Sequence, residues 1–241
     1  MRLSDFRVLT FDCYGTLIDW ESGIIAALQP LMAKGKARLD REAALASFGR
    51  HEAARQHETP GMRYSDLLSE VHRRLAEEWG VAATDEEHRT FGRSVPDWPA
   101  FADSAEALAS LKRHYKLVIL SNVDRASFRS SNARLGVAFD AIYTAEDIGS
   151  YKPDRRNFAY MLDALGERGF GREDILHTAQ SLFHDHVPAK ELGLSTAWID
   201  RRHGQAGWGA TPPAEAARYD FRFASLAEMA EARRSEAEGR G

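Results

Sequence analysis

Short apolar runs bounded by turn residues recur along the chain, and most of them are separated by segments with helical spacing. The runs are RVLTFD (7–12), KLVILSN (116–122), AIYTA (141–145), ILHTA (175–179) and TAWID (196–200). Runs that are apolar on both faces are typical of parallel strands covered by helices. The pattern therefore predicts an α/β fold built on a parallel sheet.

Residues that favour helix ends lie between the predicted strands. They are Asp103 with Glu106 as a capping box, Asp124 as an N-cap, Gly136 and Gly193 just after helix ends, and Pro153 in a first turn. The short helix that Gly193 closes is expected to begin near Asp185. Residues 224–241 are predicted to form one helix that ends in disorder, because its last dozen residues offer almost nothing to bury.

Residues 18–99 interrupt the alternation of strands and helices. They contain the helical stretches IIAALQPLMAKG, REAALASFGRHEAARQ and YSDLLSEVHRRLAEEWG, but no convincing strand. We interpret them as an all-helical cap domain inserted after the first strand. The core domain then comprises residues 1–17 and 100–241 and is discontinuous in sequence.

The composition is that of an ordinary globular protein, with 44% hydrophobic and 28% charged residues among 241. The formal net charge is -4, so neither nucleic acid nor an anionic membrane is an expected partner, and a small molecule is. No stretch approaches the roughly 18 apolar residues of a membrane span, and the N-terminus lacks a signal-peptide pattern. A single cysteine, Cys13, cannot form an internal disulfide, so a cytoplasmic location is expected.

Polar residues follow four of the five predicted strands. They are Asp12, Tyr14 and Thr16 after the first, Ser121 and Asn122 after the second, Tyr151 and Lys152 after the third, and Gln180, Ser181 and Asp185 after the fourth. Each alone is common as a turn or cap residue. Because ligands bind at the carboxyl ends of strands in an open parallel sheet, their joint occurrence indicates an active site.

The order of these motifs, D-x-Y-G-T-L, then S-N, then Y-K-P, then an acidic motif before a G-L turn, resembles the haloacid dehalogenase superfamily over nearly the whole chain. The resemblance implies a Rossmann-like core with a cap inserted after the first strand. It also implies that Asp12 is a nucleophile that forms an ester with the substrate.

Tyr14 stands where phosphatases of this superfamily carry a second aspartate. Those enzymes use that acid to protonate the leaving alcohol, and they hold magnesium with acids of their first and fourth motifs. Here Ala179 and Gln180 replace the usual Gly-Asp pair, and Asp185 is the one expected acid of that motif that remains. A magnesium-dependent phosphatase is therefore the weaker alternative, and we expect neither a metal nor a cofactor.

The tyrosine form of the first motif resembles the metal-independent L-2-haloacid dehalogenases, in which Asp attacks a saturated carbon next to a carboxylate. Such a displacement needs alignment and desolvation more than charge cancellation, and hydrolysis of the ester then releases a 2-hydroxy acid. Within this branch, the segments FDCYGTLIDWESGI, FGRHE, QHETPG, SYKPD and HDH look most similar to hydrolases of L-azetidine-2-carboxylate. That substrate, opened to 4-amino-2-hydroxybutanoate, is favoured, and an (S)-2-haloacid is the alternative.

The resemblance also implies roles for single residues. Lys152 would pair with Asp12 and keep it ionised, while Asp185 would orient Lys152 or activate the water that hydrolyses the ester. Thr16, Ser121 and Asn122 would hydrogen-bond the aspartyl group, the substrate carboxylate or the leaving group. The expected substrate-binding residues are Tyr14, Trp20, Arg50, Tyr151, Ser181 and His184.

Two features depart from the dehalogenase pattern or leave its assignment open. Leu182 stands where dehalogenases usually carry Asn, and the arginine that faces the halide or carboxylate in those enzymes is assigned here to Arg50 in preference to Arg55. The branch often forms homodimers, and the apolar cap helices suit an interface as well as an active-site lid.

A positively charged ring nitrogen would favour an acidic or aromatic pocket, for which Trp20, Glu21 and Glu52 are candidates. The HDH segment (184–186) does not have metal-ligand spacing, even with His177 nearby. His184 would instead donate a proton or pack beside the pocket.

Overall fold

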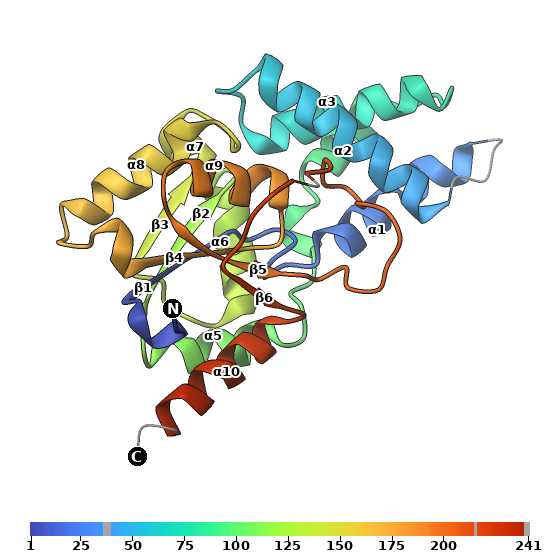
Figure 1. Ribbon diagram of the computed structural model, residues 1–241. Coiled ribbons are helices and arrows are strands. Elements are labelled where there is room, and N and C mark those ends of the chain that lie inside the picture. Colours follow the sequence, from blue (N-terminus) through green and yellow to red (C-terminus); the bar gives the residue numbers. More distant parts are fainter. Residues whose placement is uncertain (36–39, 215, 239–241) are drawn as a thin grey trace.

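The computed structural model describes residues 1–35, 40–214 and 216–238. Its core is a parallel sheet with the strand order β3-β2-β1-β4-β5-β6 (Figure 1). The strands are β1 (Val8–Phe11), β2 (Lys116–Ser121), β3 (Ala141–Thr144), β4 (Ile175–Ala179), β5 (Ser195–Ile199) and β6 (Phe221–Phe223). The first five coincide with the apolar runs to within about one residue, and the α/β prediction is confirmed. β6 was not predicted, because it is short and no position of it is fully buried.

Helices cover both faces of the sheet, which explains why its strands are apolar on both sides. The alternation is visible in β1, where Leu9 and Phe11 pack in one hydrophobic cluster and Val8 in the other. The first cluster includes residues of α5 (Ser104–Lys112), α6 (Arg125–Leu135) and α10 (Leu226–Glu238). The second includes residues of α8 (Arg155–Gly166) and α9 (Val187–Glu191).

Between β1 and α5 the chain is helical, as the sequence predicts for residues 18–99. The helices are α1 (Trp20–Lys34), α2 (Arg41–Glu58), α3 (Tyr64–Glu78), α4 (Asp85–Gly92) and the short η2 (Val95–Asp97). Figure 1 shows α1, α2 and α3 grouped on the side of the core away from both termini. The two connections to the core run together, since Ile18 and Ala100 form an antiparallel bridge and Phe101 N donates to Leu17 O at 3.1 Å.

Several predicted helix ends are confirmed. The Asp124 side chain accepts from Ser127 N at the start of α6, and Gly136 ends that helix with a positive φ of 66°. Gly193, also with a positive φ, follows α9 and the preceding π-helix η4 (Leu182–His186). Gly fits these positions because it adopts left-handed backbone conformations without a steric penalty.

Three helix ends differ in detail from the prediction. Asp103 is the N-cap residue of α5, as predicted, but its side chain does not form the capping box; its carboxylate instead accepts from Arg201 at 2.8 Å and from Ala227 N at 3.0 Å. Pro153 precedes α8, whose N-cap is Asp154. The C-terminal helix continues to Glu238, because Glu236 accepts hydrogen bonds from backbone N–H groups near the N-terminus. Residues 239–241, where the predicted disorder would end, lie outside the described residues.

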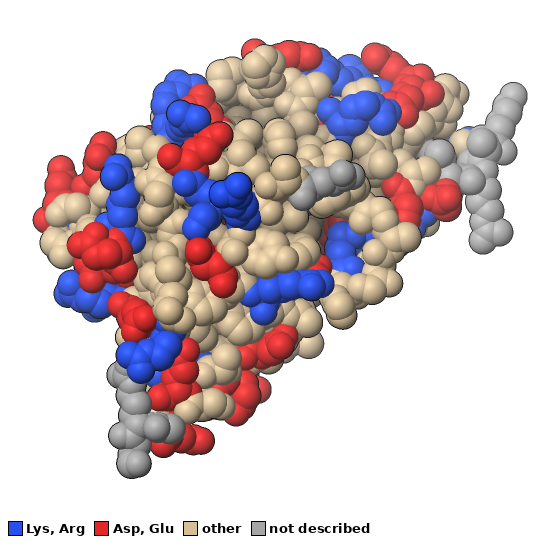
Figure 2. Space-filling view, in the orientation of Figure 1, with Lys and Arg blue, Asp and Glu red and all other residues tan. Residues whose placement is uncertain are grey.

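The surface shows no large region of one charge in the view of Figure 2, where acidic and basic side chains are interspersed. This agrees with the small net charge. None of the helices in the described ranges is both long and apolar enough to cross a membrane.

Candidate active site

The first carboxylate of the site follows directly from the end of β1. Asp12 is 6% exposed, and its backbone N–H continues the sheet by donating to Thr178 O at 3.1 Å. The turn that follows requires Gly15, which has a φ of 94° and leaves about 3.0 Å between an added Cβ and the Trp20 indole nitrogen. This turn returns Thr16 to Asp12, so that the Thr16 hydroxyl donates to Asp12 Oδ2 at 2.7 Å.

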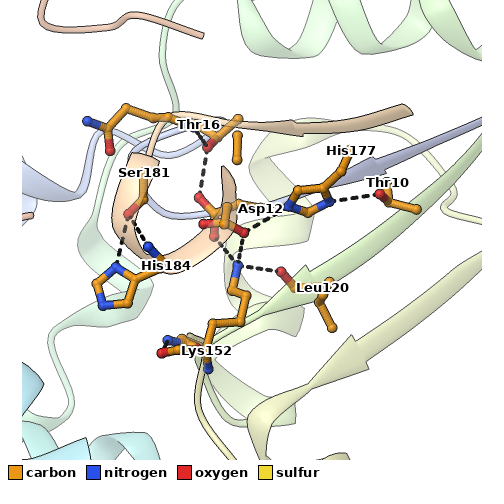
Figure 3. A network of polar contacts seen from close by, with 12 residues as sticks. Thr10, Asp12, Thr16, Leu120, Lys152, His177, Ser181 and His184 are labelled. Atoms are coloured by element: carbon orange, nitrogen blue, oxygen red, sulfur yellow. Dashed lines mark hydrogen bonds and ion pairs between the residues drawn. The ribbon is translucent and has the colours of Figure 1, made fainter. Parts of the chain in front are cut away.

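Lys152 links this carboxylate to a second one. Its buried ammonium donates to Asp12 Oδ1 at 3.0 Å, to Asp185 Oδ1 at 2.7 Å and to Leu120 O at 2.9 Å (Figure 3). The backbone of Lys152 is held by Asn122, whose side chain accepts from Lys152 N at 2.7 Å and donates to Lys152 O at 2.9 Å. Three strand ends thus converge on one ammonium group with all of its donors used.

Burial and mutual charge determine the protonation of this cluster. Desolvation disfavours charge on Lys152, but Asp12 and Asp185 raise its pKa above the ordinary value. Desolvation also acts against ionisation of Asp185, yet Lys152 and a hydrogen bond from His177 hold the pKa of Asp185 below its ordinary value. Desolvation raises the pKa of Asp12, and Lys152 opposes that shift. Lys152, together with the hydrogen bond from Thr16, therefore favours an anionic Asp12.

Asp185 is presented by an irregular turn. It lies in η4, where His186 N bonds back to Ser181 O five residues earlier, the pattern of a π-helix. Its Oδ1 atom is shared by Lys152 and by His177 Nε2 at 2.9 Å, while its Oδ2 atom is buried with no hydrogen-bond partner in the described ranges. An unpartnered carboxylate oxygen in this place is available to a substrate or a water molecule.

These carboxylates border a small pocket of about 30 Å³ between the edge of the sheet and the helices α1, α2 and α3. The residues that line it are Asp12, Tyr14, Trp20, Glu52, Gln56, Tyr64, Asn122, Val123, Lys152, Gln180, Ser181, His184, Asp185 and Thr211. This volume accommodates water but not an amino acid. A neighbouring cleft of about 590 Å³ shares Gln56, Lys152 and His184 with it, so the two spaces adjoin at these side chains.

Most of the predicted site residues come together here. Asp12, Tyr14, Trp20, Asn122, Lys152, Ser181, His184 and Asp185 line the pocket. Thr16 is buried behind Asp12, and the buried Ser121 hydroxyl has no partner in the part of the chain that the structure describes. Tyr151 borders the wider cleft, where its hydroxyl donates to Met62 O.

Some of these side chains have other partners than expected. Asn122 binds the backbone of Lys152 and not the aspartyl group. The Tyr14 hydroxyl lies 2.8 Å from Ser131 Oγ, and burial raises the Tyr14 pKa well above its ordinary value, so the phenol stays neutral. Desolvation lowers the pKa of His184 to about 4, so its imidazole is neutral near pH 7, and its Nδ1 atom lies 3.0 Å from Ser181 Oγ.

Arg50 does not reach the pocket. Its side chain is 60% exposed and donates to Glu78 Oε2 at 2.7 Å on the outside of the cap. Arg55, the second candidate, pairs with Glu58 and Glu70. Among the described residues that line the pocket, none is an arginine.

Glu21 is also not available to a substrate. It is buried in the first turn of α1, where Arg202 binds its Oε2 atom and Ala210 N donates to its Oε1 atom at 3.1 Å. Arg202 and Ala210 belong to the long connection between β5 and β6, which reaches the cap helices in Figure 1. This connection also supplies Thr211 to the pocket wall.

Sequence reasoning missed Gln56, Tyr64, Val123 and Thr211 as pocket residues, and it gave His177 no role at the carboxylates. The cap residues face the pocket from helices whose orientation depends on tertiary packing. The signal for His177 was available, because a histidine in an apolar strand two residues from the strand end must find polar partners when buried.

The magnesium ion of the phosphatase alternative does not fit the donors that the structure brings together. The ammonium of Lys152 lies between Asp12 and Asp185, and Tyr14 and Gln180 are neutral. No cluster of three His, Cys, Asp or Glu side chains that could hold a metal lies within residues 1–35, 40–214 and 216–238. The two carboxylates therefore suit an ammonium group and not a divalent cation.

Known proteins resemble this chain in sequence and in fold. A family model described as haloacid dehalogenase-like hydrolase matches residues 6–177. An (S)-2-haloacid dehalogenase of Pseudomonas putida is 26% identical over 207 residues, which are 84% of this chain and 88% of that protein.

Two solved structures share the fold of this chain. The L-2-haloacid dehalogenase from Xanthobacter autotrophicus with chloropropionic acid covalently bound has a TM-score of 0.74 at 19% identity, covering 95% of this chain and 98% of that one. The putative HAD-hydrolase YfnB from Bacillus subtilis bound to magnesium has a TM-score of 0.73 at 19% identity, covering 96% and 98%.

Proposed function

Because the chain belongs to the haloacid dehalogenase-like hydrolase family, we propose that it is a metal-independent hydrolase that displaces the C2 substituent of a small 2-substituted carboxylic acid. The observation that carries this proposal is the position of the Lys152 ammonium, which binds Asp12 and Asp185 together beside one pocket. An anionic Asp12 stabilised by a fixed cation is a suitable nucleophile for a saturated carbon.

The proposed reaction has two steps. In the first, an Asp12 carboxylate oxygen attacks C2, the bond from C2 to the substituent breaks, and the leaving group departs with the electron pair. In the second, water adds to Cγ of the Asp12 ester while Oδ2 of Asp185 accepts its proton. Collapse of the adduct expels the product oxygen, which takes up that proton, so a 2-hydroxy acid is released and Asp12 is left as a carboxylic acid. Loss of this second water proton to solvent, or to the leaving group where that group is basic, restores the Asp12 carboxylate.

The favoured substrate is L-azetidine-2-carboxylate, and the charges of the pocket support it. Glu52, in α2, lines the pocket and is 3% exposed, and its side chain accepts a hydrogen bond from the Tyr64 hydroxyl at 2.6 Å. Within the described residues it has no cationic partner, and desolvation raises its pKa to about 7. A ring ammonium would supply the missing opposite charge, while a halide leaving group would face another anion.

Displacement of halide from an (S)-2-haloacid is the alternative, and the named activities of the relatives support it. In those reactions the substrate carboxylate and halide would be bound by neutral groups here, such as Ser181, Gln180 and Tyr64. A homodimer and a cytoplasmic location stay predictions from the sequence.

Substrate assays with product identification test the proposal. We expect turnover of L-azetidine-2-carboxylate to 4-amino-2-hydroxybutanoate, compared with 2-chloropropanoate and fluoroacetate under the same conditions. In heavy-oxygen water, a single turnover should label Asp12 before it labels the product, because water attacks the ester at Cγ. Release of phosphate from an aryl phosphate that rises with added magnesium, without turnover of any 2-substituted acid, would contradict the proposal.

Glu52→Gln is expected to change substrate preference. Loss of a charge-assisted contact of about 1.5–3 kcal/mol would lower kcat/KM for azetidine-2-carboxylate by roughly 10- to 100-fold, and 2-chloropropanoate should be affected less than about threefold. Tyr64→Phe is the matched control, since it keeps the carboxyl and removes the hydroxyl that binds it.

The pH dependence of KM gives a second measurement on the same variant. In the wild type, KM for azetidine-2-carboxylate should fall as pH rises through about 7, because Glu52 binds an ammonium only when ionised. The amide introduced by Glu52→Gln has no such titration, so the variant should lose this fall in KM. Equal losses for both substrates, or an unchanged pH profile, would exclude cation recognition by Glu52.

Arg50→Ala is expected to leave KM for either substrate within about twofold of the wild-type value. Its partner is Glu78 on the cap surface, and an exposed ion pair contributes about 0–1 kcal/mol to stability. Gln56→Ala, a change in the pocket wall on the same helix, is the comparison that should alter KM. A tenfold rise in KM for Arg50→Ala would show that Arg50 reaches the substrate after all.

A further inference from the structure

His177 lies directly beneath the reacting carboxylates and has no role in the reaction described so far. It is fully buried on β4, with Nε2 2.9 Å from Asp185 Oδ1 and Nδ1 2.8 Å from Thr10 Oγ1 (Figure 3). Its ring also packs edge-on against Phe158, with centroids 5.0 Å apart. Thr10, His177, Asp185, Lys152 and Asp12 thus form one continuous polar chain through the centre of the sheet.

The hydrogen-bonding capacity of each group orients this chain. An ionised Asp185 can only accept, so His177 Nε2 must carry the proton that lies between them. In the neutral ring, Nδ1 is then an acceptor, and the Thr10 hydroxyl must be its donor. Asp185 therefore selects the tautomer of His177 that presents an N–H group to it, and Thr10 stabilises this tautomer by donating to Nδ1.

The contact determines which oxygen of Asp185 stays available. Oδ1 receives two donors, from Lys152 at 2.7 Å and from His177 at 2.9 Å. Two donors from different elements fix the plane of the carboxylate, and Oδ2 is left as a buried atom without a partner in the described residues. This is the atom that accepts the proton of the attacking water in the second step.

We propose that Thr10 and His177 are positioning residues for the second step, in which the Asp12 ester is hydrolysed. The inference rests on the proposed function and deepens it. His177 keeps its Nε2 proton throughout, the water proton moves to Oδ2 of Asp185, and no further proton carrier is needed. Ester formation depends on Asp12, which Lys152 and Thr16 hold without His177, so the first step should be nearly independent of the pair.

Single-turnover kinetics with intact-protein mass measurement separate the two steps. In His177→Leu, the rate of ester formation should stay within about threefold of the wild-type rate, while the rate of ester hydrolysis should fall by about 10²-fold. The Asp12 ester should therefore accumulate and appear as an increase in the mass of the intact protein. His177→Gln keeps an N–H donor, so it should hydrolyse the ester at least about tenfold faster than His177→Leu. Thr10→Val should give an intermediate loss.

A matched control comes from the neighbouring position on the same strand. Thr178→Val removes a buried hydroxyl that has no hydrogen-bond partner in the described residues, and it should leave both steps unchanged. Nitrogen chemical shifts of the His177 ring provide a measurement that does not depend on activity. The wild type should show a proton on Nε2, and Thr10→Val should weaken that preference.

The outcomes distinguish this inference from the proposed function. Hydrolysis of the ester at the wild-type rate in folded His177→Leu, equal losses in both steps, or a proton on Nδ1 in the wild type would each overturn the positioning role. If wild-type protein forms no ester with any 2-substituted acid, the proposed function fails, and the ring tautomer still decides whether Thr10 and His177 orient Asp185.

Discussion

Asp12→Asn is expected to abolish turnover of every 2-substituted acid, with kcat reduced by roughly 10⁴-fold or more. The substitution is nearly isosteric, so the pocket keeps its shape. An amide is a far weaker nucleophile than a carboxylate, and the ester cannot form. Intact-protein mass measurement during turnover should then show no substrate-bound species.

The control for this variant is a loss of charge elsewhere in the fold. Asp85→Asn removes a 68% exposed carboxylate on α4 that pairs with Arg73, and it should retain full activity. Water would attack the substrate directly if Asp12→Asn kept more than about one hundredth of the wild-type turnover rate and the enzyme stayed unlabelled in heavy-oxygen water. That result would remove the covalent step.

Lys152→Met is expected to have the second largest effect, because it acts on both activity and stability. The variant leaves Asp12 and Asp185 buried together without a cation, and breaking a buried pair in this way costs about 3–5 kcal/mol of unfolding free energy. Activity should fall by at least about 10³-fold, since an Asp12 that is protonated or repelled by Asp185 is a poor nucleophile.

The loss of stability in Lys152→Met should depend on pH in a defined direction. Desolvation already raises the pKa of Asp12 in the folded wild type, and removal of Lys152 eliminates the charge that opposes this shift. When the pKa of a carboxyl is higher in the folded than in the unfolded state, folding favours its protonated form. The unfolding free energy of the variant therefore falls as the pH rises through the folded-state pKa. Chemical denaturation should therefore show a larger deficit at pH 8 than at pH 5.

Lys190→Met is the matched control for the removal of a lysine. Lys190 pairs with Asp220 at 2.7 Å, but its side chain is 29% exposed, so the expected cost is about 0–1 kcal/mol with little dependence on pH. If Lys152→Met and Lys190→Met are equally stable at both pH values, the Lys152 ammonium does not neutralise the buried carboxylates.

The small pocket has a consequence for the catalytic cycle. A space of about 30 Å³ holds water but no 2-substituted acid, so the proposed reaction requires movement of side chains that line the pocket. Gln56 and His184 border both the pocket and the wider cleft, and they belong to the cap and the core, respectively. Separation of these two side chains would join the pocket to the wider cleft.

The sequence by itself determined the sheet, the helical segment after β1 and the polar groups that gather at one edge of the sheet. Runs that are apolar on both faces have few alternatives to buried parallel strands, and polar residues at their carboxyl ends must meet at one edge. For that reason the order of the motifs predicted that Asp12, Lys152 and Asp185 lie close together, and the structure joins them by two ion pairs.

Only the tertiary structure decided the partners of long or isolated polar side chains. Arg50 has enough reach for either the pocket or the surface, and the position of Glu78 on α3 draws it outward. Glu52 and Tyr64 meet across two cap helices, and Asp103 binds Arg201 from a distant connection and not its own helix. Such contacts depend on how helices pack, because hydrophobic patterns record which face is buried and not which polar groups meet there.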